Sequence, residues 1–473
     1  MNAPKSSGSQ WAHDELCSAN LPDRRHVVRA VKMLTRMAER PAGRVLDVFE
    51  TSAERQGAYD LLANSAVSEE PLCRSIGEAT VLRAADDAMM FVAVDGTSLK
   101  LTDRQRAKDF GAIGSHRAGA RGLKVINGYG VSSQGIPLGI TSQVWWSRKP
   151  SKRRQDHQSR RLEGKETRHW VEAIERTCAL VRHLAVSTRL CFLLDREGDG
   201  VHTLSTLVSC GHDFIVRSAH NRRLATPGKQ RAYLRNVLAR VPAGGEFRLS
   251  VPAGPRRTAR SARMVTRYHE VNLLLRDHAT GKRTTAKITA ISARETGTRP
   301  RGEQPLHWML LTNRPVQSFE DACVVVYGYA QRWRLEDFHR TWKSGDCNVE
   351  ECQLRRAAHV KKWATLMAAT AARIERMKML ARTEPNLPAS IELTPYEIQA
   401  LVLNRRRTKK RTDPTPTDNP TIGEAVRWLA DIGGYTGKSS GGPPGSITIA
   451  RGFERIIPAA LLLKQLEREG RLR

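Results

Sequence analysis

Long apolar runs are the first thing that this sequence lacks. No stretch approaches the roughly 18 uninterrupted apolar residues that a membrane-spanning helix needs. The segment from Met1 to Leu16 has no apolar core of the kind found in a secretory signal. The sequence therefore predicts neither a membrane span nor secretion, and we expect the protein in the cytoplasm.

Closely spaced cysteines are also scarce. The eight cysteines are scattered along the chain, and only Cys347 and Cys352 lie near each other. Their spacing matches no common zinc motif. Because a reducing compartment keeps thiols reduced, we expect all eight side chains to be free thiols.

Acidic residues are few relative to basic ones. The chain has 78 Lys and Arg against 48 Asp and Glu, which gives a formal net charge of +30. Its hydrophobic fraction of 40% is that of a folded globular protein, and 473 residues suggest roughly three domains. A folded protein of this charge attracts polyanions, so nucleic acid is the first expected partner and an anionic membrane surface the second.

The pattern of apolar residues divides the chain into three regions. Residues 1–80 predict a helical domain, because apolar residues recur at helical spacing from Leu21 to Met37 with basic residues between them. Residues 81–385 alternate strand and helix patterns, which predicts an α/β domain with a β-rich insertion over about residues 222–305. Residues 386–473 predict a mainly helical C-terminal domain.

Two apolar strand patterns each end on an aspartate. Asp95 follows Phe91–Val94, and Asp195 follows Cys191–Leu194, an unbroken apolar run typical of a central strand. One such aspartate is usually a turn or cap residue. Because ligand sites of open α/β sheets lie at the carboxyl ends of the strands, the pair predicts two carboxylates at one functional edge.

The segment from Tyr329 to Lys343 has the pattern of one helix with two opposed faces. At about 100° per residue, four polar residues fall on one face: Tyr329, Arg332, Glu336 and Lys343. Three apolar residues fall on the other face and predict a seam against the core: Leu335, Phe338 and Trp342. The polar row fits a solvated face or a functional one. Asp337 points off that row, so Glu336 is the better third carboxylate.

Three carboxylates at one site suit a pair of magnesium ions. Hard divalent cations prefer oxygen ligands, and two of them about 3.5–4 Å apart serve an in-line phosphoryl displacement. Without metal, a cluster of Asp95, Asp195 and Glu336 would repel itself. Arg332 and Lys343 on the same helix face would then fit phosphate binding.

Three segments carry a family resemblance: Phe91–Leu99, Asp195–Asp199, and the residues Tyr329, Arg332, Glu336 and Lys343 at successive spacings of 3, 4 and 7. Together they resemble bacterial insertion-sequence transposases of the DDE class that carry a Y-R-E-K motif, and that spacing is highly specific. The likeness covers nearly the whole chain and weakens after about Arg382. It extends to Gln56–Tyr59, Trp145–Trp146, Phe214–Ser218 and Trp308.

The resemblance implies a fold and a reaction. The fold would be a ribonuclease-H-like catalytic core interrupted by a β insertion, with an N-terminal domain that binds transposon ends and a C-terminal dimerisation domain. Asp95, Asp195 and Glu336 would hold two Mg²⁺ ions, for which Mn²⁺ should substitute. Water would cut one strand, and the freed 3′-hydroxyl would attack the other. The resulting hairpin would be reopened before insertion into target DNA.

The resemblance also implies DNA contacts. Tyr329, Arg332 and Lys343 would grip the end phosphates, with Arg217 beside them. Trp308 would stack on a flipped base, although from sequence alone it reads as a core tryptophan of a strand over residues 307–312. Position in the N-terminal domain, rather than a motif, assigns three residues to end recognition: Arg24, Arg25 and Arg29.

The implied partners are double-stranded DNA and a second copy of the chain. The DNA would be the terminal inverted repeats and the target, and the homodimer would assemble on DNA at the bacterial nucleoid, with no membrane partner and no small-molecule cofactor. Two alternatives stay open: a DNA-binding repressor or architectural protein that does no chemistry, and a structure-selective nuclease on the same core. The basic stretch Lys149–Arg161 fits a target-DNA contact and a solvated loop equally well.

Overall fold

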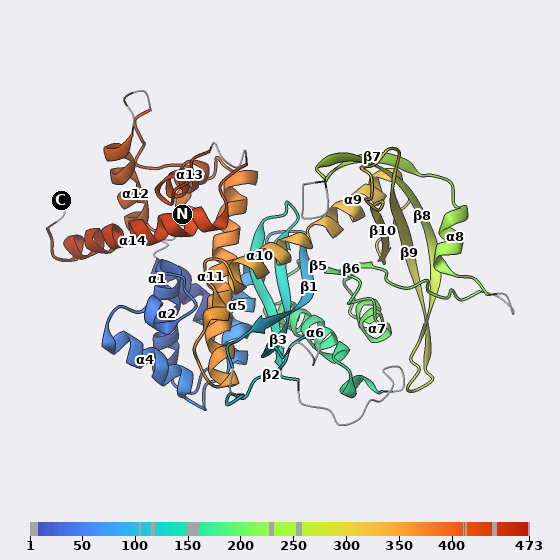
Figure 1. Ribbon diagram of the computed structural model, residues 1–473, viewed down its shortest axis with the longest axis horizontal. Helices are drawn as coiled ribbons and strands as arrows, with labels where there is room; N and C mark the ends of the chain where they lie inside the picture. The colour runs from blue at the N-terminus through green and yellow to red at the C-terminus, as the bar shows by residue number, and fades with distance from the viewer. Residues whose placement is uncertain are drawn as a thin grey trace.

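A ten-stranded sheet runs through the middle of the molecule (Figure 1). The computed structural model describes residues 8–103, 106–114, 119–148, 160–226, 231–251, 258–409, 411, 414–437 and 442–471. Most of Lys149–Arg161 therefore lies outside the described residues. The strands are β1 (Met89–Lys100), β2 (Gly111–Ala112), β3 (Arg121–Ser132), β4 (Pro137–Trp146), β5 (Arg189–Leu194), β6 (Asp213–Arg217), β7 (Gly245–Val251), β8 (Arg260–Arg276), β9 (Arg283–Thr296) and β10 (His307–Thr312). Their spatial order is β2-β3-β1-β5-β6-β10-β9-β8-β7, with β4 beside β3.

The first part of the sheet is the α/β core, and its arrangement is consistent with the expected ribonuclease-H-like fold. β3 runs antiparallel to β1 and β4 antiparallel to β3, whereas β5 and β6 run parallel to β1. The apolar run of β5 is buried, as expected for a central strand. Helices α6 (Thr167–Leu184) and α7 (Val201–Ser209) pack on one face. Helices α9 (Phe319–Ala330), α10 (Trp333–Lys343) and α11 (Ala357–Thr383) pack on the other face.

The β-rich insertion continues the core sheet. It contains α8 (Leu234–Arg240) and strands β7 to β9. β10 then returns to the core and pairs antiparallel with both β6 and β9. Because one continuous hydrogen-bond ladder joins the two parts, the insertion is held in register with the carboxyl ends of β5 and β6.

The segment expected as one helix from Tyr329 to Lys343 is two helices, so that expectation was wrong. Helix α9 (Phe319–Ala330) ends before Gln331, and α10 (Trp333–Lys343) begins after Arg332. Backbone bonds between residues three apart close this turn, including Arg332 N–H to the Tyr329 carbonyl at 3.1 Å. The apolar seam formed as expected, because Leu335, Phe338 and Trp342 are all buried.

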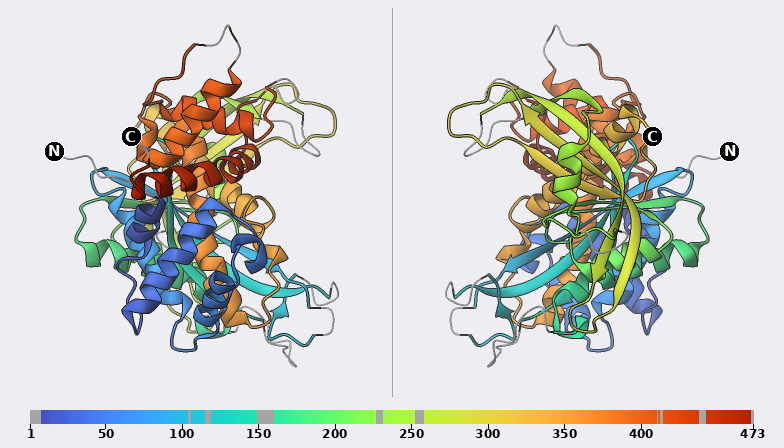
Figure 2. Two further views of the ribbon diagram at one scale, coloured as in Figure 1. Left: turned by 90° about the vertical axis from the view of Figure 1, so that its left-hand side faces the viewer. Right: turned by 90° about the vertical axis from the view of Figure 1, so that its right-hand side faces the viewer.

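Two helical regions pack beside the sheet (Figure 2). The N-terminal region comprises α1 (Gly8–Leu16), α2 (Arg24–Glu39), α3 (Val45–Val48), α4 (Ser52–Ala63) and α5 (Glu69–Leu82). The C-terminal region comprises α12 (Pro395–Thr408), α13 (Ile422–Ile432) and α14 (Ser446–Arg468). The 27-residue helix α11 (Ala357–Thr383) packs against both regions and against the sheet.

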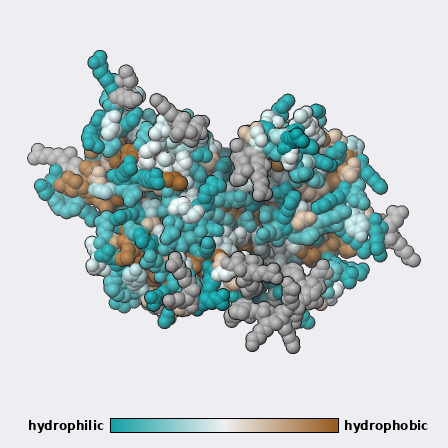
Figure 3. Space-filling view, viewed as in Figure 1, coloured by the Kyte–Doolittle hydropathy of each residue, from teal (hydrophilic) through white to brown (hydrophobic). Residues whose placement is uncertain are grey.

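The outer surface agrees with the composition. The face seen in Figure 3 is mostly hydrophilic, with small separate apolar patches. Among the described helices, none combines the length and the apolar character needed to span a bilayer. All eight cysteines are free, as expected.

Candidate active site

Asp95 and Asp195 lie side by side where the parallel pairing of β1 with β5 ends. Asp195 follows β5, whereas Asp95 lies within β1, which continues to Lys100, so the expectation that a strand ends at Asp95 was wrong. β1 and β5 are parallel and in register up to the pair Val94 and Leu194, and each aspartate is the next residue. Neighbouring strands are about 4.8 Å apart. The fold therefore brings the two predicted carboxylates together, although they are a hundred positions apart in the sequence.

Local hydrogen bonds fix the orientation of both carboxylates. The Asp95 Oδ1 atom accepts a hydrogen bond from the Gly96 backbone N–H at 2.7 Å. Asp195 Oδ1 accepts one from the Glu197 N–H, also at 2.7 Å. The Oδ2 atom of each aspartate takes no part in this local hydrogen bond.

Arg332 joins the third predicted carboxylate to the first. Its guanidinium donates to Asp95 Oδ2 at 3.1 Å and to Glu336 Oε1 at 2.7 Å. The side chain is only 6% exposed. We expected Arg332 to face a phosphate, but in this structure it forms the bridge between two members of the acidic set.

The environment of Asp95 disfavours its ionised form. Burial, followed by the negative charge of Asp195, raises the pKa of Asp95 to about 7, and the positive charge of Arg332 only partly offsets this. The carboxyl is thus close to half protonated at neutral pH. A cation at this edge would favour the ionised form.

Lys343 lies at the far end of α10, beside the continuation of β1. Its Nζ atom donates to Thr97 Oγ1 at 3.1 Å and is 3.8 Å from Glu350 Oε1. Thr97 is two residues beyond Asp95, on the same side of the extended strand. Lys343 therefore lies near the carboxylates, and its contact with DNA phosphates stays a prediction.

Tyr329, Trp308 and Arg217 form a second group next to Arg332. The rings of Trp308 and Tyr329 meet edge to face with centroids 5.6 Å apart. Tyr329 is buried, and among the described residues its hydroxyl has no hydrogen-bond partner. The Arg217 Nη2 atom donates to the His307 carbonyl at 3.1 Å. Trp308 is half-buried in β10, so the strand assignment made from the sequence is confirmed.

The three N-terminal arginines lie apart from this site. Arg24, Arg25 and Arg29 are exposed on the first two turns of α2. Arg25 pairs with the helix cap Asp23 at 2.7 Å. The Arg29 guanidinium lies against Gly57 of α4, within the segment Gln56–Tyr59.

Two supporting residues were not assigned from the sequence. Asp199 is fully buried and holds the loop after β6. Its carboxylate accepts from Arg222 Nε at 2.8 Å and from the Ala219 N–H at 2.7 Å. The sequence held one signal for Asp199, which was its position in the Asp195–Asp199 motif. Exposed Trp333, whose ring is 5.4 Å from the Arg332 guanidinium, carried no such signal.

A buried polar chain lies behind Asp95. Asn127, the residue opposite Asp95 on β3, hydrogen-bonds the His339 ring at 2.9 Å and accepts from Gln143 at 2.9 Å. Burial, together with the positive charges of Lys343 and Arg332, lowers the pKa of His339 to about 3. The imidazole is thus neutral and ties α10 to the sheet.

The donor set is chemically suited to a hard cation, although the side chains are not arranged around one. Carboxylate oxygens are the ligands that Mg²⁺ prefers. Among the described residues, no group of three His, Cys, Asp or Glu side chains is positioned to enclose a metal ion. Arg332 stands between Asp95 and Glu336 instead.

Two regions of the chain match known protein families. Residues 8–67 match the family described as transposase DNA-binding, and residues 369–462 match the transposase Tn5 dimerisation domain. The first match covers α1 to α4. The second begins inside α11, upstream of the domain start at residue 386 that the sequence suggested. These matches support a transposase that binds DNA and forms a homodimer.

Replacement of Asp95 by asparagine should stabilise the folded protein much more at high pH than at low pH. The folded-state pKa of about 7 lies above the usual value of 3.8, so the favourable contribution of Asp95 is present below pH 3.8 and lost as the pH rises towards 7. We expect Asp95→Asn to raise the thermal midpoint by a few degrees at pH 8 and much less at pH 5. Differential scanning fluorimetry at both pH values measures this.

Asp103→Asn is the control of opposite sign. Burial alone would raise the Asp103 pKa, but hydrogen bonds from Arg121 and the Lys108 N–H outweigh it and lower that pKa. This variant should therefore lower the midpoint at pH 8. An equal shift for Asp95→Asn at both pH values would contradict the assigned environment of Asp95.

The variant Asp199→Ala, which removes the buried carboxylate, should strongly destabilise the protein. Breaking a buried ion pair leaves the Arg222 charge uncompensated, which typically costs about 3–5 kcal/mol. The exposed pair of Glu246 and Arg263 is the matched control, and Glu246→Ala should cost less than about 1 kcal/mol. Urea denaturation measures both, and equal costs would refute the anchoring role of Asp199.

Proposed function

We propose that this chain is a Mg²⁺-dependent DNA transposase of the Y-R-E-K group of DDE enzymes. It would excise DNA at terminal inverted repeats by strand nicking, hairpin formation and hairpin opening, and then join the ends to target DNA. The single observation that carries the proposal is the side-by-side placement of Asp95 and Asp195, linked through Arg332 to Glu336.

Asp95, Asp195 and Glu336 would hold two Mg²⁺ ions. When bound, such ions activate the attacking oxygen and stabilise the leaving oxygen of the phosphodiester. The donor set supports this assignment because burial and the Asp195 charge keep the pKa of Asp95 raised even with Arg332 beside it, so a further cation would favour the ionised carboxylate. Mn²⁺, which also accepts carboxylate ligands, should substitute.

Arg332 has a role in the protein before DNA binds. It is paired with Asp95 and Glu336, and it thereby offsets the repulsion among the carboxylates. Its planar fork also suits a phosphate bidentately. In the proposed reaction Arg332 leaves its carboxylate partners and binds a phosphate of the DNA end. Tyr329 and Lys343 would bind the end phosphates with it, and Arg217 would do so next to Tyr329.

The other partners follow from the two matched domains. The exposed residues Arg24, Arg25 and Arg29 on α2 would contact phosphates of the transposon end. Such contacts fix register rather than read bases. The homodimer would assemble on DNA through the C-terminal region, and the protein would act at the bacterial nucleoid.

Cleavage tests the proposal directly. The substrate is a duplex that carries the short inverted repeats flanking the gene, incubated with protein and Mg²⁺. We expect nicked and hairpin products from the wild type. The variants Asp95→Ala, Asp195→Ala and Glu336→Ala should each keep DNA binding. Cleavage should fall at least about a hundredfold in each, because the metal and the stabilisation of the transition state are lost. Denaturing gels report the products.

Asp337→Ala is the control on the same helix, because Asp337 points to Arg340 rather than to the site. It should cleave normally. Cleavage that persists in all three alanine variants contradicts the proposal. Cleavage of branched DNA without strand transfer favours the structure-selective nuclease, and binding without any cleavage by the wild type favours a repressor.

Trp308 tests the hairpin step separately. Stacking of an aromatic ring on a base is worth about 1–3 kcal/mol, so Trp308→Ala should lower hairpin yield by about tenfold to a hundredfold while first-strand nicking continues. Trp308→Phe, which keeps a ring, should restore most of the yield. Equal loss of nicking and hairpin formation in both variants would assign Trp308 to the core alone.

A further inference from the structure

Four arginines from separate elements gather around His307, at the start of β10. Arg294 of β9 is the cross-strand neighbour of His307, and Arg217 of β6 donates to its carbonyl at 3.1 Å. Arg235 of α8 donates to the carbonyl of Ala219, in the loop after β6, at 3.0 Å. Arg196 follows Asp195 directly. All four contribute positive charge at the His307 ring.

These arginines lack acidic partners. Among the described residues, no carboxylate forms an ion pair with Arg196, Arg217, Arg235 or Arg294, whereas some arginines of the insertion are paired. Arg260 pairs with Glu295 at 2.7 Å, and Arg263 with Glu246 at 2.6 Å. Because β5, β6, β10 and β9 are neighbours in the sheet, Arg196, Arg217 and Arg294 converge at one edge beside Arg235, and this convergence of unpaired positive charge suits an external anion.

His307 fits the same interpretation. Its Nε2 atom lies 3.1 Å from Ser292 Oγ, and the ring is half-buried. Burial and then the neighbouring arginines lower its pKa, so the ring is neutral and adds no repulsion to the group. The imidazole offers hydrogen bonding in the middle of a positive field.

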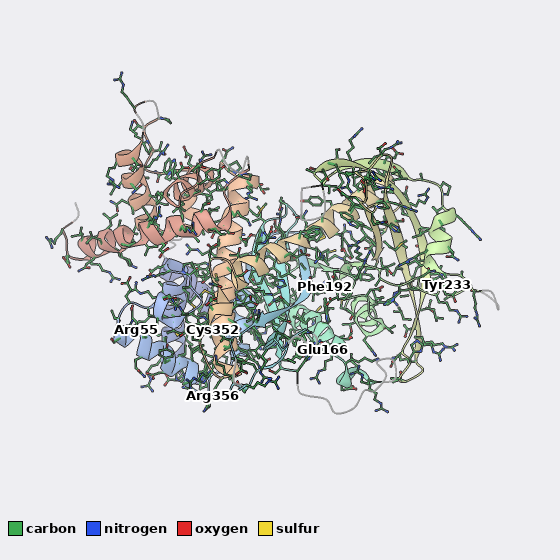
Figure 4. The ribbon with its side chains drawn as sticks, in the orientation of Figure 1. Arg55, Glu166, Phe192, Tyr233, Cys352 and Arg356 are labelled. Carbon is green, nitrogen blue, oxygen red and sulfur yellow. The ribbon has the colours of Figure 1, made fainter. Side chains whose placement is uncertain are left out.

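The group lies at the same edge of the sheet as the carboxylates. β10 runs antiparallel to β6, so its first residue lies near the carboxyl ends of β5 and β6. Successive residues of a strand point to opposite faces, so His307 faces the side of α6 and α7 whereas Trp308 faces the side of α9 and α10. In Figure 4, the label Phe192 marks β5 and the label Tyr233 marks the start of α8.

The loop anchored by Asp199 positions part of the group. Asp199 accepts from the backbone of Ala219 and from Arg222, and the neighbouring Asn221 side chain accepts from the Arg235 N–H at 2.9 Å. The same loop leaves β6 just after Arg217. A buried carboxylate thus holds the group in place without neutralising its exposed arginines.

We propose that Arg196, Arg235 and Arg294 form, around His307, a second phosphodiester site that holds one DNA strand where it leaves the acidic edge on the α6–α7 side of the sheet. This inference rests on the proposed function for the identity of the ligand as DNA. The sheet edge that carries Asp95 and Asp195 then has positively charged residues on both faces, those of α9 and α10 on one face and this group on the other. Each set holds the DNA backbone on its own side of the cleaved bond.

Binding of a short probe tests the site without any cleavage. The probe is a fluorescein-labelled single-stranded oligothymidylate of about eight nucleotides, in the absence of divalent metal. We expect the triple variant Arg196→Gln, Arg235→Gln and Arg294→Gln to bind roughly tenfold more weakly than wild type. The slope of log affinity against log salt should fall by about 2, since each phosphate contact on a single strand contributes about 0.7. Fluorescence anisotropy measures both.

The control removes the same charge elsewhere on the insertion. Arg248→Gln, Arg276→Gln and Arg283→Gln alter three exposed arginines of β7 to β9. This variant should lose less than twofold in affinity. Equal losses in the two triple variants would overturn the proposal, because they would show a diffuse field rather than a site. Arg294→Gln alone, with Arg276→Gln as its match, repeats the comparison if the triple variant does not fold.

Two further measurements fix the ligand and its position. A probe with 5-iododeoxyuridine should crosslink under ultraviolet light to the peptide that contains His307, and crosslinks only elsewhere would overturn the proposal. Inorganic tripolyphosphate should displace the probe poorly. If it binds as tightly as the probe, with the same dependence on the three arginines, the site takes free phosphate and not DNA. Neither measurement depends on cleavage, so failure here is separate from failure of the transposase assay.

Discussion

The parallel pairing of β1 with β5 is the constraint on which the site depends. The in-register ladder ends at Val94 and Leu194, so Asp95 and Asp195 must stand next to each other. Burial and the neighbouring negative charge of Asp195 oppose the ionisation of Asp95, and the raised pKa of Asp95 is the result. Arg332 offsets part of this cost, and the tight turn at Gln331–Arg332 places its side chain inward.

The positive charge of the chain has two distinct uses. Some arginines are internal structural partners of buried carboxylates, as in the pairs of Arg222 with Asp199, Arg83 with Glu15, and Arg260 with Glu295. Other arginines have no carboxylate partner in the described part of the chain, and those around His307 are among them. Their positive charge is available to a polyanion such as DNA.

Helix α11 joins regions that the sequence suggested were separate. The Trp363 indole donates to the Gly43 carbonyl of the N-terminal region at 3.0 Å, and Thr365 donates to Gln143 of β4 at 2.8 Å. Thr341 of α10 donates to Glu375 at 2.5 Å. The region that matches a dimerisation domain begins within this helix. Helix α10 and the C-terminal region are thus in direct contact, and each helps to fix the position of the other.

Much of this architecture follows from local pattern. The apolar run of β5, the aspartate that ends it, and the buried seam of α10 each depend on a few consecutive residues and their spacing, which is why they could be predicted. The break between α9 and α10 could not be predicted, because no proline or glycine marks it. The turn depends on where Arg332 finds its partners.

The sequence by itself determined which residues are available: two aspartates after apolar runs, four polar residues between Tyr329 and Lys343, and a large excess of basic residues. Only the tertiary structure decided their partners. The contact of Arg332 with Asp95 and the grouping of four arginines around His307 join residues that are far apart along the chain. Spacing reports which face a residue occupies, whereas the distances between elements depend on how their apolar faces pack.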